Sequence, residues 1–378
     1  MDVDDPDQYF ASYENLDVHK LMLEDEPRTL AYKNAILNNK AYFKDKIVMD
    51  VGCGTGILSI FCAQAGAKKV YAVEASNLAI LAKKIVEENK FENVIEVLHK
   101  RVEEVILPNY LKVDAIVSEW MGFYLLHEGM LDSVLYAKEW FLKDDGEIFP
   151  ESATIYVAPC SIPTLYDSWN NFHGVSMTSF AKELRASKGN KPEILNVEPE
   201  DLMGPEVAFC YVNLKEDEPH DLNHYTLQHI VGASKDGNYQ GFCIWFQCNF
   251  PELPDCTGDS HTVLDTSPQS PATHWKQTVI VLPEQRQVDE GEPIAFQLDM
   301  HRANVKSRRY NLQLTMLDPE IEEHPLPCTC HMTKCILTKA YMEQHAEQAK
   351  IEARMVMSNS PKKYSTVLTD EDIIDEGD

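Results

Sequence analysis

A glycine-rich turn constrains the fold of this chain more than any other feature. The sequence DVGCGTG begins at Asp50, at the end of the short apolar run Ile47–Val51. Its glycines allow the backbone to approach a ligand closely and to adopt conformations that a Cβ atom would forbid. Strand and helix signals alternate beyond it, which predicts an α/β fold with a doubly wound, mostly parallel, Rossmann-like sheet. The predicted segments are a helix over Ile57–Ala65, a strand over Val70–Val73, a helix over Asn77–Asn89, and strands over Val94–Leu98 and Ala115–Val117.

The pattern changes on either side of this region. Residues 1–46 favour helix, and we expect Pro27 to interrupt a helix there. From Thr154 onward, β-branched and apolar strands separated by turns predict a β-barrel or sandwich that ends near Leu317. Its clearest predicted strands are Thr154–Val157, Gly241–Phe250, Gln277–Leu282 and Ile294–Leu298. We therefore predict four parts, which cover 1–46, 47–150, 151–317 and a C-terminal extension over 318–378. In the extension, the helix-compatible stretch Lys339–Val356 precedes an acidic end that we expect to be disordered.

Composition excludes several classes of protein. Hydrophobic content of 44% and charged content of 25% in 378 residues fit a soluble globular protein. We expect no membrane span, because no apolar run reaches the roughly 20 residues that one needs. The acidic start lacks the basic and apolar regions of a signal peptide, so we expect a cytoplasmic or nuclear protein. The net charge of −27 disfavours direct binding to nucleic acid and favours cationic partners.

The cysteines raise one question about metal binding. Ten cysteines occur, and none forms a CxxC pair. In Cys328-Thr-Cys330-His331, with Cys335 nearby, three thiols and an imidazole could bind zinc. A packed or surface segment is the alternative that we favour, because the spacing departs from the usual zinc pattern. We therefore assign no metal ligand from the sequence.

The turn itself indicates a nucleoside ligand. A dinucleotide fingerprint would place a third glycine where Ile57 stands, and no lysine of a P-loop follows. Glu74 ends the second predicted strand, where a carboxylate can accept hydrogen bonds from both ribose hydroxyls. A nucleoside without a diphosphate fits this combination, and S-adenosylmethionine meets that description. The alternative is a tight turn with a surface glutamate.

Two carboxylates raise a question of charge. Glu119 and Glu128 lie nine positions apart in SEWMGFYLLHE, among mostly apolar and aromatic residues. Desolvating carboxylates is costly unless a cation or hydrogen bonds compensate. That cation could be a sulfonium cofactor, a structural arginine or a substrate guanidinium. Two carboxylates on one guanidinium could bias its charge away from one terminal nitrogen and aim the lone pair of that nitrogen at a methyl group.

Five separated motifs in the same order resemble the type I protein arginine N-methyltransferase family. They are Tyr9-Phe10-x-x-Tyr13, the pattern of His19, Met22, Asp25 and Arg28, the glycine loop with Glu74, SEWMG with its second glutamate, and Thr273-His274-Trp275. The resemblance runs from Tyr9 to about Leu317 and is strongest to the branch with the sixth human member and its insect relatives. It implies that 1–46 is a helical cofactor lid, that 47–150 binds S-adenosylmethionine, and that 151–317 is a β-barrel domain with a dimerisation arm near 163–190.

The resemblance also implies a role for each matching residue. Glu119 and Glu128 would clamp the substrate guanidinium, and His274 would pair with Asp25, as an organising pair or as a proton acceptor. Substrate would contact Tyr13 and Trp275. The cofactor would contact Phe10, His19, Met22, Arg28, Asp50, Gly52, Gly54, Glu74, Val102 and Glu103. Met22 would leave space for a second methyl on one nitrogen, which implies asymmetric dimethylarginine.

The expected activity is methyl transfer from S-adenosylmethionine to arginine in histone tails and glycine–arginine-rich proteins, by a homodimer in the nucleus or cytoplasm. Two rivals remain. One is methylation of a nucleic acid or metabolite, and the other is an inactive binding scaffold. The basic runs at 307–309 and 361–363 are too short to count as nuclear import signals.

Overall fold

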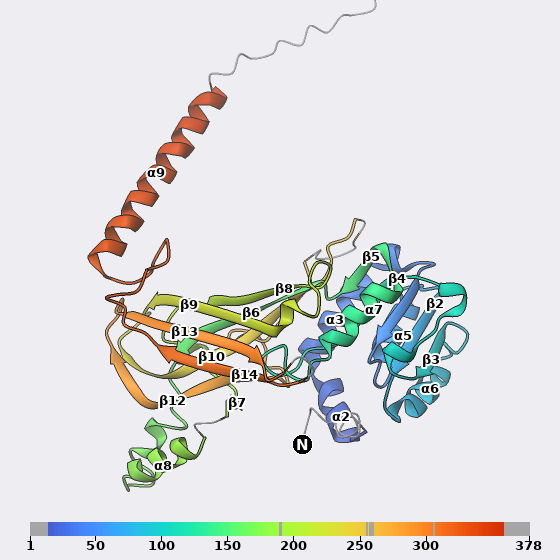
Figure 1. Cartoon of the computed structure of the whole chain (residues 1–378), viewed down its shortest axis with the longest axis horizontal. Helices are drawn as coiled ribbons and strands as arrows, with labels where there is room; N and C mark the ends of the chain where they lie inside the picture. Colours follow the sequence, from blue (N-terminus) through green and yellow to red (C-terminus); the bar gives the residue numbers. More distant parts are fainter. Residues whose placement is uncertain (1–13, 189–190, 255, 257–260, 305–306, 359–378) are drawn as a thin grey trace, which may run out of the picture.

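A five-stranded parallel sheet forms the first half of the protein (Figure 1). The computed structural model describes residues 14–188, 191–254, 256, 261–304 and 307–358. The strand order is β3-β2-β1-β4-β5, with every neighbouring pair parallel. The strands are β1 (Ile47–Val51), β2 (Lys69–Glu74), β3 (Ile95–His99), β4 (Val113–Val117) and β5 (Leu142–Phe149), and the helices between them are α5 (Ile57–Gln64), α6 (Leu78–Glu88) and α7 (Leu131–Phe141).

This sheet confirms the predicted α/β class, and its predicted strands lie within one or two residues of those observed. The central strands are buried along nearly their whole length, as β4 is at all five positions. A strand that helices cover on both faces has a nearly continuous apolar sequence, and such apolar runs predicted these strands. Strand β5 was not predicted, because residues 143–145 of this edge strand are exposed and charged.

The N-terminal helices break where proline predicts. Helix α2 (Leu16–Glu24) ends before Asp25, and α3 (Glu26–Asn38) has Pro27 in its first turn, where a missing N–H costs nothing. The Asp25 side chain caps α3 by accepting a hydrogen bond from the Arg28 backbone N–H at 3.1 Å. The short helix α4 (Lys40–Phe43) leads into β1. Tyr9, Phe10 and Tyr13 of the first predicted motif lie outside the described residues.

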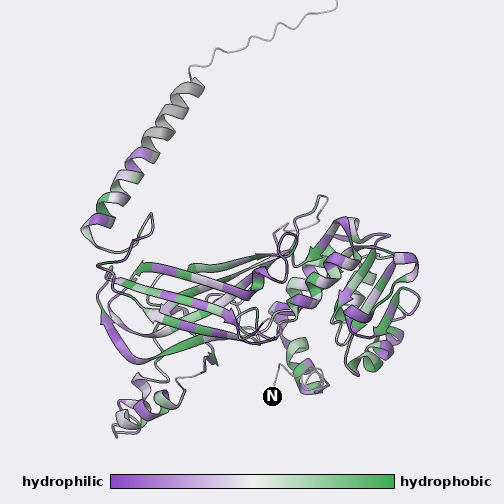
Figure 2. Ribbon diagram, viewed as in Figure 1, coloured by the Kyte–Doolittle hydropathy of each residue, from purple (hydrophilic) through white to green (hydrophobic). Residues whose placement is uncertain are grey.

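An antiparallel β-domain follows. One sheet has the order β7-β12-β10-β6-β8, with β11 paired to β10, and a three-stranded sheet has the order β14-β13-β9. Figure 2 shows hydrophobic and hydrophilic residues interleaved along the long strands, as in β14, where exposed and half-buried positions alternate. The strands are β6 (Ser152–Cys160), β7 (Glu193–Leu195), β8 (Val207–Asn213), β9 (His224–Gly232), β10 (Gly237–Asn249), β11 (Val263–Asp265), β12 (Gln277–Val288), β13 (Pro293–Arg302) and β14 (Tyr310–Met316).

Two helices lie outside these layers. Helix α8 (Thr178–Lys188) belongs to an excursion between β6 and β7, and α9 (Thr333–Ser358) leads away from the β-domain (Figure 1). Helix α9 begins six residues before the predicted Lys339. The predicted disordered end lies outside the described residues. None of the described helices combines the length and apolar composition that crossing a membrane requires. Short 3₁₀ helices cover Val102–Glu104, Pro108–Tyr110, Asp167–Trp169, Pro199–Asp201 and Asp221–Asn223.

The two halves share a hydrophobic core and an ion pair whose arginine is buried. Arg302 in β13 donates two hydrogen bonds of 2.7 Å to the carboxylate of Asp132 in α7, and a third of 2.8 Å to the Tyr310 hydroxyl. The Arg302 side chain is only 4% exposed. The planar guanidinium fork therefore fixes α7 against the β-domain.

We predict that Asp132→Ala lowers the free energy of unfolding by about 3 kcal/mol, because it leaves the Arg302 charge buried without its carboxylate. Urea denaturation followed by tryptophan fluorescence measures the loss. The control is Glu96→Ala, which removes a surface ion pair with Lys69 (51% and 30% exposed) and is expected to cost less than about 1 kcal/mol. Equal losses of unfolding free energy in the two variants would contradict the view that Asp132 compensates a buried charge on Arg302.

Candidate active site

One cavity of about 580 Å³ brings together most of the predicted site residues. Its wall is formed by the loop after β1, helices α2 and α3, the loop over 118–130, and residues of the β-domain. The predicted residues that line it are His19, Met22, Arg28, Gly52, Gly54, Glu74, Val102, Glu103, Glu119, Glu128, His274 and Trp275. Asp25 and Asp50 do not line it, and Phe10 and Tyr13 lie outside the described residues.

The glycine loop follows β1 as predicted. Gly52, Gly54 and Gly56 have φ angles of +72°, +53° and +85°, which residues with a Cβ rarely adopt. The N–H groups of Gly52 and Cys53 both donate to the Val73 carbonyl at 2.9 Å, which holds the loop against β2. A Cβ on Gly52 would lie 2.2 Å from Cε of Met130. The backbone of this loop therefore forms part of the cavity wall.

Glu74 stands at the end of β2, with its carboxylate fixed in place. Its Oε2 accepts from the Gly54 N–H at 2.9 Å, and its Oε1 accepts from the N–H and hydroxyl of Ser76 at 2.8 and 2.7 Å. A carboxylate has about four lone-pair positions, so Oε2 keeps one free for a ligand hydroxyl. This arrangement fits the predicted ribose contact.

Asp50 lies beneath the cavity and is fully buried. Its Oδ2 accepts a 2.6 Å hydrogen bond from the Ser59 hydroxyl, which ties β1 to α5, and its Oδ1 has no partner among the described residues. Burial raises the pKa of Asp50 to about 7. The structure thus gives Asp50 a place in supporting the loop, whereas direct contact with a cofactor remains a prediction.

Arg28 and Glu119 form a buried ion pair at the centre of the site. Two nitrogens of Arg28, Nε and a terminal nitrogen, donate to Glu119 Oε2 at 3.0 and 2.7 Å, and the other terminal nitrogen donates to the Met22 carbonyl at 3.2 Å. Burial lowers the pKa of Arg28, but the neighbouring carboxylate outweighs this effect and raises it. Glu119 Oε1 accepts a 3.2 Å bond from the Met121 N–H. One face of the carboxylate is therefore occupied by the protein, and Oε1 retains accepting capacity.

The loop that carries Glu128 is strained. Tyr124, Leu125 and Glu128 have φ angles of +41°, +71° and +78°, although none is glycine. Such conformations cost energy and persist where the surroundings enforce them. The Glu128 N–H donates to the Arg308 carbonyl, and Arg308 donates through a terminal nitrogen to the Glu128 carbonyl, both at 2.8 Å. The β13–β14 connection thus holds Glu128 in position.

His274 and Trp275 reach the cavity from the β-domain. Nδ1–H of His274 donates to Asp25 Oδ2 at 2.6 Å, and the His274 backbone N–H donates to the same oxygen at 2.8 Å. Burial raises the pKa of Asp25, but the hydrogen bonds from His274 and Arg28 outweigh it and lower the pKa overall. The Trp275 indole N–H donates to the Met121 carbonyl at 2.9 Å. Asp25 therefore holds the imidazole in position.

The opposite end of the cavity contains Val102 and Glu103, in the 3₁₀ turn after β3. Glu103 accepts a 2.8 Å hydrogen bond from the Ser133 hydroxyl of α7. They follow β3, the neighbour of the strand β2 that ends at Glu74, and the adenine contact remains a prediction.

Of the wall residues that sequence reasoning did not assign, two shape the site most clearly. Met130 packs beneath Gly52, and Arg308 fixes Glu128 from 180 positions away in the sequence. Ser307-Arg308-Arg309 was considered only as a short basic run. No local signal could have placed Arg308, because only the tertiary fold brings the β13–β14 connection to the 118–130 loop.

Curated relatives match over most of the chain. Protein arginine N-methyltransferase 6 of Xenopus tropicalis is 38% identical over 317 residues, covering 81% of this chain and 90% of the relative. The chain belongs to the type I protein arginine N-methyltransferase family. Human protein arginine N-methyltransferase 2 is 36% identical, covering 82% of this chain and 72% of the relative. Residues 151–317 match the arginine methyltransferase oligomerization subdomain, and 35–126 match the ribosomal protein L11 methyltransferase (PrmA) family.

Solved structures agree with this assignment. The Trypanosoma brucei PRMT1 enzyme-prozyme heterotetrameric complex with AdoHcy superposes with a TM-score of 0.72 at 33% identity, over 83% of this chain and 98% of that chain. A PRMT6-SAH structure superposes with a TM-score of 0.68 at 30% identity, over 80% of this chain and all of that one. The predicted family, fold and cofactor class are thereby confirmed. The protein is an S-adenosylmethionine-dependent arginine methyltransferase, and its glycine loop, ribose carboxylate and cavity volume fit that cofactor.

We predict that Gly52→Ala weakens binding of S-adenosylhomocysteine about tenfold, because the new Cβ is strained and pushes Met130 into the cavity. Isothermal titration calorimetry measures the affinity. Gly174→Ala is the matched control, since Gly174 has a φ of +85° but no atom within 4 Å of the added Cβ. Unchanged affinity for Gly52→Ala would contradict the close approach of the loop to the cofactor.

Proposed function

We propose that this methyltransferase modifies arginine in arginine-rich protein segments, such as histone tails and glycine–arginine-rich proteins, to give monomethylarginine and asymmetric dimethylarginine. The observation that carries this proposal is the presence of Glu119 and Glu128 in one cavity with His274 and Trp275. A guanidinium stays protonated at physiological pH and presents a planar set of donors that matches carboxylates.

The two glutamates differ in which of their carboxylate oxygens can accept a hydrogen bond from the substrate guanidinium. Arg28 occupies Oε2 of Glu119, which leaves Oε1 to accept an N–H of the substrate. Glu128 offers the second carboxylate from the strained loop. Hydrogen bonds that the guanidinium donates to both carboxylates draw the positive charge toward the bound nitrogens and leave electron density on the third nitrogen. Held in this orientation, that nitrogen is positioned for attack.

The bound cofactor supplies an electrophilic methyl group on sulfur. Transfer leaves one extra proton on the substrate nitrogen, and the chain offers two acceptors. They are the Glu128 carboxylate and Nε2 of His274, whose Nδ1–H is held by ionised Asp25. We favour an organising role for His274, because both its side chain and its backbone bond to one buried carboxylate oxygen.

Product and substrate classes follow from the surroundings. Met22 lines the cavity beside Arg28, where the family resemblance leaves space for a second methyl on the same nitrogen. The net charge of −27 attracts basic tails over longer distances. The same charge argues against nucleic acid as the methylated molecule. We propose the nucleus or cytoplasm as the compartment, and imaging of a tagged protein tests it.

We predict that Glu128→Gln lowers the rate of peptide methylation about a hundredfold while S-adenosylhomocysteine still binds, because only the substrate clamp is weakened. Mass spectrometry measures one and two added methyl units on an arginine-rich histone-tail peptide, beside its Arg→Lys counterpart. Fragmentation that places both methyls on one nitrogen identifies the asymmetric product.

Glu87→Gln is the control, since Glu87 is exposed on α6 and does not line the cavity. Near-normal turnover by Glu128→Gln would contradict the two-glutamate mechanism. No methylation of either peptide by the unmodified protein, with cofactor bound, would favour another substrate or a scaffold role.

We propose further that two copies pair through the predicted arm at 163–190. Its base is fixed, since Tyr166 is buried and the Arg185 guanidinium lies 3.9 Å from the centre of its ring. Its outer part carries an aromatic cluster, with Trp169 packed on Phe172 and Phe180 at ring distances of 5.3 and 4.9 Å. Phe172 and Phe180 remain 45% and 50% exposed, which favours burial by a second copy.

We predict that Phe180→Glu converts a dimer into a monomer, because the charge would be buried in the contact. Sedimentation velocity measures the mass of the particle. Tyr211→Glu, at a 58% exposed aromatic residue in β8, serves as the control and is expected to leave the dimer intact. A monomeric unmodified protein at micromolar concentration would refute pairing through the arm.

A further inference from the structure

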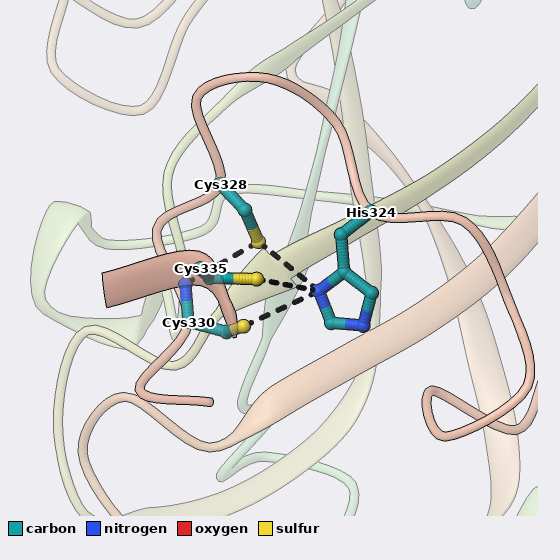
Figure 3. Close-up of side chains that lie close together, drawn as sticks. All are labelled: His324, Cys328, Cys330 and Cys335. Carbon is teal, nitrogen blue, oxygen red and sulfur yellow. Dashed lines mark hydrogen bonds between the residues drawn. The ribbon is translucent and has the colours of Figure 1, made fainter. Parts of the chain in front are cut away.

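Four possible metal ligands converge just before α9. His324, Cys328, Cys330 and Cys335 each point one donor atom toward a common centre (Figure 3), and these four atoms all lie within 4.8 Å of one another. The three thiols are buried. This group lies at the end of the β-domain away from the parallel sheet (Figure 1), and none of its residues lines the cavity of the candidate active site.

More sulfur atoms surround Nδ1 of His324 than this nitrogen can accept hydrogen bonds from. Its Nδ1 lies 3.4, 3.3 and 3.1 Å from the sulfurs of Cys328, Cys330 and Cys335. The other ring nitrogen, Nε2–H, donates to the Pro319 carbonyl at 2.9 Å, so Nδ1 carries a single lone pair aimed at the sulfurs. One lone pair accepts one hydrogen, yet three sulfhydryl groups surround it. A cation at the centre resolves this arrangement.

The geometry matches a tetrahedral zinc site. A tetrahedral zinc ion has Zn–N bonds of about 2.0 Å and Zn–S bonds of about 2.3 Å. These bond lengths place the ligand nitrogen about 3.5 Å from each sulfur, and the sulfurs about 3.8 Å from one another. The observed distances from Nδ1 to the three sulfurs, 3.1 to 3.4 Å, lie near the nitrogen–sulfur value. We propose that His324, Cys328, Cys330 and Cys335 bind one Zn²⁺ through three thiolates and one neutral imidazole. Binding releases three thiol protons to water and leaves a site of net charge −1.

The surroundings support a coordinated histidine and thiolates. A metal-bound imidazole usually donates its second N–H to a carbonyl or carboxylate, as Nε2 does here to Pro319. The Cys330 backbone N–H donates to the sulfur of Cys328 at 3.5 Å, which favours the thiolate. The ligands follow the spacing H-x₃-C-x-C-x₄-C, which differs from the common CxxC pairs.

The histidine is not the one that the sequence pattern grouped with the cysteines. His331, adjacent to Cys330, is exposed, and its backbone N–H donates to the Gly291 carbonyl at 2.7 Å. Its side chain packs against Gly291 in the β12–β13 turn. A loop that includes Pro319 and Pro325 returns His324 to the cluster instead.

The site would attach α9 to the body of the protein. Thr329, between two ligands, accepts a 2.8 Å hydrogen bond from the Gly232 N–H at the end of β9, and His331 bonds to the β12–β13 turn. Cys335 lies in the first turn of α9. Zinc would therefore fix the start of this projecting helix relative to the β-domain. Structural zinc sites contribute folding energy of this kind.

Metal content of the full-length protein tests the site. Protein is purified in reducing buffer without chelator, incubated with Zn²⁺, desalted and measured by plasma mass spectrometry. We expect one zinc per chain, released only after a mercurial reagent blocks the thiols. Replacement by Co²⁺ should give the visible absorption of tetrahedral cobalt together with thiolate charge-transfer bands.

Matched variants locate the ligands. His324→Asn and Cys335→Ser are expected to lose the zinc, whereas His331→Asn and Cys256→Ser are expected to keep it. Circular dichroism and methyl transfer, which needs none of these residues, show that each variant has folded. Zinc retained by His324→Asn, loss of zinc from His331→Asn, or no uptake by the reduced protein would overturn the proposal, as would a disulfide among the three cysteines.

Discussion

The turn between α2 and α3 joins three distant segments through buried charge. Arg28 and Glu119 are each about nine-tenths buried, and burying such charges is favourable only when the pair is complete. Asp25, three residues earlier, caps α3 and holds His274 from the β-domain. Helix α3, the loop after β4 and the loop before β12 therefore depend on one another. Cofactor cavity and substrate wall are assembled by the same contacts.

Strain in the 118–130 loop is a second constraint. Left-handed conformations of Tyr124, Leu125 and Glu128 each cost on the order of 1–3 kcal/mol. Hydrogen bonds between Gly122 and Leu125 close the loop, and the paired bonds to Arg308 hold its far end. A Cβ on Gly122 would lie 2.0 Å from the His127 carbonyl oxygen, so only glycine allows this close turn. The sequence around Glu128 is therefore shaped by backbone geometry as well as by chemistry.

Features encoded locally could be predicted from the sequence, and features set by tertiary contacts could not. Buried parallel strands such as β1 read as apolar runs, and Gly52 and Glu74 follow them at fixed offsets. Strand β5 was missed, because Lys143 and its neighbours face water at a sheet edge. Family resemblance supplied the pairing of Asp25 with His274, which are 249 positions apart. Arg308 and His324 had no such guide, since only the fold places them beside their partners.

The two carboxylates of the proposed clamp are anchored by different parts of the molecule. Glu119 is held by the N-terminal helices, and the backbone of Glu128 is held by the β13–β14 connection. Their separation therefore depends on how the β-domain docks against the parallel sheet. If the two glutamates bind a guanidinium as proposed, contacts from both halves of the molecule set the shape of its binding site.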